Sequence, residues 1–392
     1  YSDNKSYAKI TSPIHADLID LTYEDDDISN DGESSIDFSA NANDDLLQFR
    51  TVFTRKIFSK SKVKFGTHFF DQSSKFQNYV FKKASTVNGD HNIPDNEKSG
   101  LVKFEELLKT GFIEFDLRVF KKFALNTGLR YESSDLIEKN SISPRLSMAY
   151  KISKNSQTSY AYGQYFQTPE IGFDQWYRQN NIMIQDNLTN LNFEESTHHI
   201  LNYEWSTKEK TLRLEIFDKQ YDNLIALTPH NSLEEWEEIR FLSNNGDGYS
   251  KGFEMFLRFN QKNNDGVGQD IWIAYSYLDS KRKFKQYTDA IIPSFASNHK
   301  LTLVYKRLFK LSDGSRFSSS VALTGTSGFP YYDPYNDIQY ESKPYLSFDI
   351  GGSYLPKIED GFMVIFFNVS NPFGYRNSFG YNYIDYDSLK NH

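Results

Sequence analysis

The chain has 392 residues, no cysteine, 16% aromatic residues and a formal net charge of −8. The lack of cysteine excludes a disulfide scaffold and sites built on thiolate sulfur. The acidic balance argues against nucleic acid as a partner, because phosphate binding needs clustered Lys and Arg. No apolar run reaches the roughly 18 residues of a membrane helix, but a barrel strand crosses with about 10 residues of which only every second one is apolar.

Residues 1–44 are polar and acidic. Within them, Asp27, Ser29 and Asp31 follow the first spacings of a calcium-binding loop. The twelfth position is Phe38, where such a loop needs a bidentate Glu. We therefore interpret this segment as a solvated acidic loop without a metal.

From Asp45 onward, alternation of apolar and polar residues predicts about 14 antiparallel strands separated by turn residues. They span residues 45–57, 61–82, 102–119, 122–136, 142–152, 156–166, 192–206, 210–227, 248–260, 268–281, 297–308, 315–327, 343–355 and 361–371. Short turns alternate with connections that are mostly longer, such as 167–191 and 328–342. This order is typical of an outer-membrane up-and-down barrel, with plain turns at one end and elaborated loops at the other. A soluble sandwich mixes long and short connections at both ends.

Strand parity supports the same architecture. In "GFEMFLRF", Phe253, Met255 and Leu257 lie on one face of the strand. Glu254 and Arg258 lie on the other, which suits a watery lumen. We expect the apolar face to contact lipid, and a soluble all-β core is the alternative interpretation.

Residues that could carry chemistry do not converge in this pattern. His198 and His199 are adjacent in a predicted strand, so they point to opposite faces and cannot share a metal. Glu194 and Glu195 diverge for the same reason, and the acidic run at 234–238 is interpreted as a solvated loop. The sequence contains no signature of a nucleophilic, phosphate-binding or zinc-dependent active site. We expect no enzyme, no cofactor and no metal site.

Several stretches, read in order, resemble the barrel of TonB-dependent outer-membrane receptors of the Bacteroidetes type. "LNTGLRYE" followed by "SPRLSMAYKISKNSQTSYAYGQYFQTPE" is similar to a G-x-R-Y strand, an S-P-R-L strand and a hairpin that leads into a loop. "NNGDGYSKGFEMFLRF" resembles a strand that opens with an S-K-G-F-E signature, and "VIFFNVSNPFGYRNSFGYNY" resembles the penultimate strand and its loop. The resemblance covers residues 45–392.

The resemblance implies a location in the bacterial outer membrane and a barrel of about 22 strands that encloses a plug. Residues 1–44 would then hold the end of a strand followed by an external loop. Residues 45–392 would form a barrel segment that ends in an external loop, without the plug and the last strand. The chain starts at Tyr1 without a leader, and we expect it to be a mature or internal segment of a larger protein.

The resemblance also implies function and partners. The TonB–ExbB–ExbD complex would act through the plug to drive uptake of a siderophore, cofactor, peptide or glycan. A surface lipoprotein, lipid and lipopolysaccharide are further expected partners. Aromatic loop residues are the candidate ligand contacts, namely Trp176, Tyr177, Trp236, Tyr331 and Tyr332. A structural barrel subunit of a larger outer-membrane assembly is the main alternative, and a soluble β-rich binding protein is the second.

Overall fold

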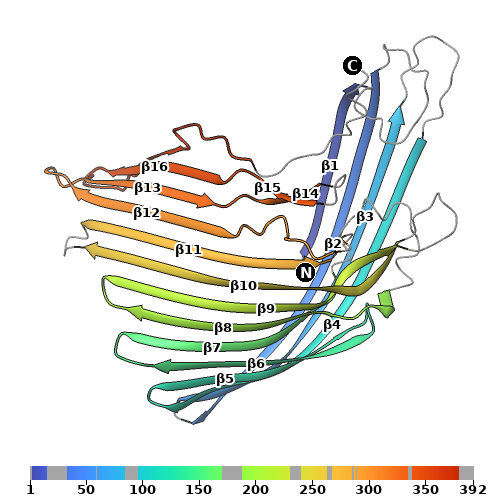
Figure 1. Cartoon of the computed structure of the whole chain (residues 1–392), viewed down its shortest axis with the longest axis horizontal. Helices are drawn as coiled ribbons and strands as arrows, with labels where there is room; N and C mark the ends of the chain where they lie inside the picture. The colour runs from blue at the N-terminus through green and yellow to red at the C-terminus, as the bar shows by residue number, and fades with distance from the viewer. Residues whose placement is uncertain are drawn as a thin grey trace.

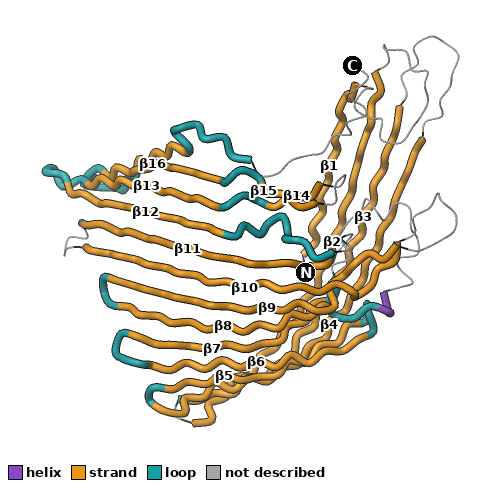
Figure 2. Tube along the Cα trace, viewed as in Figure 1, coloured by secondary structure: helices purple, strands orange, loops and turns teal. Residues whose placement is uncertain are grey.

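The structure, a computed structural model, describes residues 2–15, 33–58, 60–83, 96–169, 188–229, 240–262, 267–284, 287, 289–333 and 338–378. These residues form one curved antiparallel sheet of 15 strands and a separate two-stranded hairpin (Figure 1). Strands account for most of the described chain. Its helical part is a single 3₁₀ turn at 188–190 (Figure 2). Across the described residues, no helix combines the length and the apolar character needed to span a membrane.

The large sheet is a meander, in which consecutive strands pair, except that β13 pairs with β16 because β14 and β15 form the separate hairpin. Its strands are β1 (Ser2–His15), β2 (Glu33–Phe58), β3 (Ser61–Lys83), β4 (Asn96–Phe120), β5 (Phe123–Ser134), β6 (Lys139–Lys151), β7 (Ser156–Gln167), β8 (Glu194–Ser206), β9 (Lys210–Pro229), β10 (Arg240–Lys262), β11 (Gly268–Lys283), β12 (His299–Lys310), β13 (Arg316–Thr326), β16 (Tyr345–Leu355) and β17 (Ile365–Ser370). The expected all-β antiparallel architecture is confirmed.

Some strands run further than the alternation predicts. β2 begins at Glu33 rather than near Asp45, and β10 begins at Arg240 rather than near Gly248. The added residues are largely small or polar, so they carry no period-2 signal. Those of β2 nevertheless continue the backbone ladder with β3, and those of β10 continue the ladder with β9. The expected loop 328–342 also contains a hairpin, formed by β14 (Pro330–Asp333) and β15 (Ile338–Glu341).

Short turns join the strands at one end, as Figure 1 shows, and the connections at the other end are longer, apart from the short β5–β6 connection at 135–138. The turn between β12 and β13 illustrates why the short end closes so tightly. Asp313 accepts a hydrogen bond from the Ser315 backbone N–H at 2.9 Å, and Gly314 adopts the left-handed conformation with φ 88°. The hydrogen bond from the Ser315 hydroxyl lowers the pKa of Asp313.

One face of the sheet, called here the outward face, is an apolar belt. Leu257 of β10 pairs with Leu212 of β9 and Ile273 of β11, so apolar side chains lie side by side across three strands. Leu201 on β8 and Ile216 on β9 continue this face and are 51% and 57% exposed. A belt of exposed apolar side chains on one parity is what a lipid-facing surface requires.

The belt ends abruptly toward the long connections. Phe253 and Tyr277 pair in the last apolar row, and the next outward row joins Lys251 to Asp218 and Asp279. The Lys251 Nζ lies 3.8 Å from an Asp218 carboxylate oxygen, and both side chains are exposed. This change from aromatic to charged within one row marks the boundary between lipid and water on the outward face.

The opposite face, called here the inward face, carries ion pairs in mid-strand. Arg258 of β10 donates two hydrogen bonds to the Asp270 carboxylate of β11, at 2.9 and 2.7 Å. The Trp272 indole N–H donates to the same carboxylate at 2.8 Å. On β5, Arg130 pairs with Glu132 at 2.7 Å. Charged networks of this kind need water or polar partners, so this face suits a hydrated lumen.

The sheet is open between its outermost strands. β1 and β17 are its edges, and within the described residues they do not pair with each other. Each residue of β17 is exposed, including Phe366 at 81%. Unpaired backbone groups cost several kcal/mol each in hydrocarbon, so both edges need strand partners when the sheet lies in a membrane.

The parity assignment predicts opposite outcomes for one substitution on the two faces. Leu257→Arg places a charge in the middle of the outward belt and should destabilise the bilayer-embedded protein by about 2–4 kcal/mol. Ser276→Arg places the same side chain on the inward face, between Glu254 and Lys300, and should cost much less. Equilibrium unfolding of both variants in lipid vesicles measures the difference, and equal destabilisation would contradict a lipid-facing belt.

Candidate functional site

A small hydrophobic cluster, called here the loop-side core, lies at the end of the sheet where most of the longer connections leave the strands. It contains four buried side chains, which are Ile137, Leu188, Leu191 and Phe193. Ile137 is fully buried and Leu191 is 1% exposed, although the sheet around them is one layer thick. Five partly buried side chains pack against the cluster, namely Leu108, Leu136, Phe166, Ile225 and Leu242. The cluster therefore joins the β5–β6 connection and the entry to β8 to four strands.

The segment before β8 is held in place by polar contacts as well. The Asn244 side chain of β10 accepts from the Asn192 backbone N–H at 2.7 Å and donates to the Asn192 carbonyl at 3.1 Å. It also donates to the Asn223 carbonyl at 2.7 Å, where β9 has a positive φ of 57°. One amide of β10 thus satisfies backbone groups on two other segments, which fixes residues 188–193 against the end of the sheet.

A buried carboxyl lies beside this cluster. Glu106 of β4 is 5% exposed and accepts hydrogen bonds from the Ser134 hydroxyl at 2.7 Å and the Thr168 hydroxyl at 3.2 Å. Ser134 ends β5 and pairs with Leu108, so Glu106 lies beyond the end of β5 and outside the membrane-spanning part of the sheet. Burial raises the pKa of Glu106 above its ordinary value, and the nearby Asp135 acts in the same direction.

The β14–β15 hairpin forms a second ordered element among the long connections. Tyr331 and Tyr340 pair across it with ring centroids 5.9 Å apart. The Gln339 side chain accepts from the Ile292 backbone N–H at 2.9 Å and donates to the Ile292 carbonyl. Gln339 therefore attaches the hairpin to the connection between β11 and β12.

The predicted ligand contacts are only partly visible. Tyr331 lies in β14 and packs against Tyr340, as described above. The backbone of Tyr332 pairs with Gln339, but its side chain lies outside the described residues, as do Trp176, Tyr177 and Trp236. The structure does not test these five residues, and their role as ligand contacts stays a prediction.

The two adjacent histidines point to opposite faces, as predicted. The His198 Nε2 lies 2.6 Å from the Ser196 hydroxyl on the inward face. The His199 Nδ1 lies 2.8 Å from the Tyr160 hydroxyl on the outward face. Across the described chain, no group of three or more His, Asp or Glu side chains could hold a metal ion. The calcium-like spacing that begins at Asp27 lies largely outside the described residues.

The acidic residues that could have suggested acid–base chemistry have structural partners. Glu194 accepts from the Ile225 backbone N–H at 2.9 Å, and Glu195 accepts from the Gln164 amide at 3.2 Å. The acidic run 234–238 lies outside the described residues.

Sequence reasoning missed Glu106, Asn244 and Gln339, which organise the loop end. Asn244 and Gln339 carry no sequence signal, because polar residues in predicted loops are expected to be solvated. For Glu106, its place in the strand predicted at 102–119 gives its parity but not its burial.

Comparison with known families gives one match that covers most of the chain. The family model described as TonB dependent receptor-like, beta-barrel, matches residues 1–371. No curated protein matches the chain in sequence.

Solved structures with the same fold support this match. The outer membrane transporter YddB from Escherichia coli is similar with a TM-score of 0.60 and 12% identity, over 90% of this chain and 52% of that one. The ferric yersiniabactin uptake receptor FyuA from Yersinia pestis has a TM-score of 0.57 and 13% identity, over 88% and 52%. The ferripyoverdine receptor of Pseudomonas aeruginosa has a TM-score of 0.61 and 11% identity, over 95% and 49%. The chain therefore spans about half the length of the structures it matches.

The raised pKa of Glu106 predicts a pH dependence of the loop-side core. Its protonated form favours the folded core, so this contribution is present below the ordinary value of 4.5 and is lost as pH rises through the raised pKa. Hydrogen exchange of amides 188–193, corrected for intrinsic rates, should show protection that falls with rising pH. Glu106→Gln should flatten this dependence, whereas Glu105→Gln, at an exposed neighbour, should leave it unchanged. Identical profiles in all three proteins would contradict the assignment.

Proposed function

The chain belongs to the TonB dependent receptor-like β-barrel family, and from this membership we propose that it forms wall and external loops of an outer-membrane receptor. The receptor takes up a large or scarce nutrient, such as a siderophore, cofactor, peptide or glycan, and the chain carries no enzymatic activity. The observation that carries the proposal is the family match to residues 1–371, together with the fold shared with outer-membrane transporters.

The two faces and two ends of the sheet support this function. An apolar outward face suits lipid, and ion pairs such as Arg258–Asp270 suit a hydrated lumen. Short turns close one end, while the loop-side core and the β14–β15 hairpin organise the other. We assign the elaborated end to the cell exterior, where ligand is first met.

We propose that aromatic side chains of the long connections contact the ligand. The candidates are Trp176, Tyr177, Trp236, Tyr331 and Tyr332. Aromatic rings supply large contact areas at little entropic cost and are enriched in binding surfaces. The stacked pair Tyr331–Tyr340 on a docked hairpin offers such a surface on a fixed support. Similar folds belong to receptors whose names specify ferric yersiniabactin and ferripyoverdine, so ferric chelates are the first class to test.

The energised step belongs to parts of the receptor beyond this sheet. We propose that a plug lies against the inward face and that the TonB–ExbB–ExbD complex acts on the plug to release ligand. We further propose that the receptor is of the Bacteroidetes type and works with a surface lipoprotein.

Uptake measured in cells tests the transport proposal. A strain that lacks the gene should lose TonB-dependent accumulation of at least one ligand in a panel of ferric siderophores, cobalamin, peptides and oligosaccharides. Restoring the full-length gene should restore uptake, and removing the proton gradient should abolish it. Unchanged uptake of the whole panel, with loss of a surface protein complex on deletion, would instead indicate a structural barrel subunit.

The assigned orientation is tested with epitope tags. A tag inserted into the connection between β7 and β8, or into the connection between β13 and β16, should be accessible to antibody on intact cells, because these strands meet their connections at the elaborated end. A tag inserted after Lys208 should react only in permeabilised cells, since the 207–209 turn closes the plain end, where the Thr207 N–H donates to the Lys210 carbonyl at 2.8 Å. Labelling of the Lys208 tag on intact cells would reverse the orientation.

A further inference from the structure

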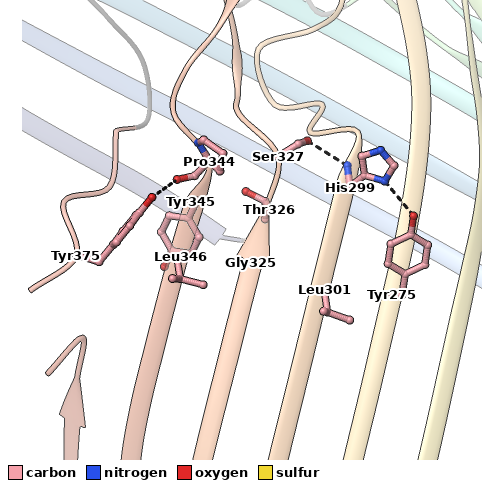
Figure 3. A pocket seen from close by; sticks show the side chains of 10 residues that line it. All are labelled: Tyr275, His299, Leu301, Gly325, Thr326, Ser327, Pro344, Tyr345, Leu346 and Tyr375. Atoms are coloured by element: carbon pink, nitrogen blue, oxygen red, sulfur yellow. Dashed lines mark hydrogen bonds between the residues drawn. The ribbon is translucent and has the colours of Figure 1, made fainter. Parts of the chain in front are cut away.

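The outward face contains a crevice of about 360 Å³ near the elaborated end of β11, β12, β13 and β16. Figure 3 shows the side chains that line it. The residues that matter for its shape and chemistry are Tyr275, His299, Leu301, Gly325, Leu346 and Tyr375. Its ten lining residues include no Asp, Glu, Lys or Arg, although charged residues are common on the inward face.

The crevice lies within the apolar belt. Tyr275 pairs with Leu301, Leu301 with Gly325, and Gly325 with Leu346, so one outward row crosses four strands. The row continues on β10 with Met255. The charged row that contains Lys251 lies two rows further toward the elaborated end. The crevice therefore opens at the depth of lipid chains, close to the boundary with water.

A missing side chain creates the hollow. A Cβ built on Gly325 would lie 3.8 Å from the Leu346 Cδ1 and 3.9 Å from the Tyr345 carbonyl oxygen, which are ordinary contacts. The flanking Leu301 and Leu346 side chains are 43% and 39% exposed. Gly325 thus leaves a gap between two leucines, although neither its backbone conformation nor its neighbours would exclude a side chain at this position.

Polar groups form a fixed rim. The Tyr275 hydroxyl lies 2.9 Å from the His299 Nδ1, and the Ser327 hydroxyl accepts from the His299 backbone N–H at 3.1 Å (Figure 3). On the other side, the Tyr375 hydroxyl donates to the Pro344 carbonyl at 3.3 Å. Apolar walls below a rim of hydroxyl and imidazole groups match a molecule with a hydrocarbon chain and a polar head.

The far wall is also held in place. The Asn377 side chain accepts from the Leu346 backbone N–H and donates to the Leu346 carbonyl, both at 2.9 Å. This amide occupies the edge of β16 where β17 no longer pairs, since the β16–β17 ladder begins at Asp349. The segment that carries Tyr375 is thereby fastened to the sheet, so the crevice is preformed.

A second part of the sheet repeats the rim without the hollow. On β7 and β8, Tyr160 and Tyr162 face His199 as Tyr275 and Tyr277 face His299, and the closer ring pair is 5.2 Å apart in both cases. The next strand there places Ile216 beside Leu201, whereas Gly325 lies beside Leu301. The Tyr–His rim alone therefore makes an ordinary boundary, and Gly325 distinguishes the crevice.

We propose that this crevice binds one acyl chain of an outer-leaflet membrane lipid, with the lipid head group at the His299–Tyr275 rim. The crevice is continuous with the apolar belt that faces hydrocarbon, and its walls carry no charge for a polar solute to pair with. The inference rests on the proposed membrane location. It adds a specific lipid site to a belt that otherwise contacts lipid without preference.

Photocrosslinking tests the site directly. The full-length receptor is reconstituted in dioleoyl-phosphatidylglycerol vesicles that contain a small fraction of the same lipid with a diazirine on one acyl chain. After irradiation, crosslinked peptides are identified by mass spectrometry. Crosslinks should be severalfold enriched at residues 299–301, 325–327 and 344–346 over the Tyr160–His199 region.

Gly325→Ile should reduce the crosslinks at the crevice to the level of the Tyr160–His199 region, because the side chain fills the hollow as Ile216 does there. Gly111→Ile is the matched control, since Gly111 shares a row with the outward Tyr131 and a Cβ built on it has no atom within 4 Å. It should leave the crevice crosslinks unchanged. Heat-modifiable migration of both variants on gels checks that each retains a folded barrel.

The outcomes separate the site from the function. Enrichment that is absent, or that survives Gly325→Ile, would overturn the lipid site while crosslinks elsewhere on the belt keep the membrane location intact. A crevice covered by a second copy of the chain would give no lipid crosslinks there and a crosslinked dimer, which also overturns the site. Crosslinks nowhere on the outward face would overturn the membrane location and the lipid site together.

Discussion

The pairing of backbone N–H and C=O groups between adjacent strands is the constraint on which the rest of this structure depends. A sheet one layer thick has little core, and the described chain contains few buried apolar side chains. Cooperative folding in water usually relies on such a core, so this sheet must gain its stability from the ladder and from its surroundings. In hydrocarbon the ladder becomes obligatory, because a backbone group that leaves it has no water to bind.

The ladder also fixes the chemistry of the two faces. Paired strands present alternate side chains to opposite sides, so the register of one strand decides which face every one of its side chains occupies. A shift of one residue would place Arg258 and Asp270 in the apolar belt and Leu257 in the lumen, at a cost of several kcal/mol for each charge. The aligned rows from Leu257 to Lys251 show that the register is consistent across neighbouring strands. This arrangement separates an apolar face from a charged, hydrated face, which suits the transport function proposed above.

Departures from the regular ladder occur where function is expected. At the elaborated end, the loop-side core, Asn244 and Gln339 supply contacts that the ladder no longer provides, and they hold long connections in defined positions. On the outward face, Gly325 interrupts an otherwise continuous apolar row and leaves a preformed crevice. Both are local features placed on a rigid scaffold, which is how binding sites are commonly built.

The sequence by itself determined the properties that repeat locally. Period-2 alternation predicted the strands and their parity, the alternation of short and long connections predicted the two unlike ends, and the strand motifs identified the receptor family. These signals can be detected in the sequence because the face that a strand residue occupies, toward lipid or toward water, follows from its position in the strand and not from distant residues. Only the tertiary structure revealed the early start of β2 at Glu33, the burial of Glu106, the docking of Gln339 on Ile292 and the hollow at Gly325. Each of these features depends on which distant segments lie side by side. The sequence alone does not show whether a polar residue or a glycine contacts water or another strand.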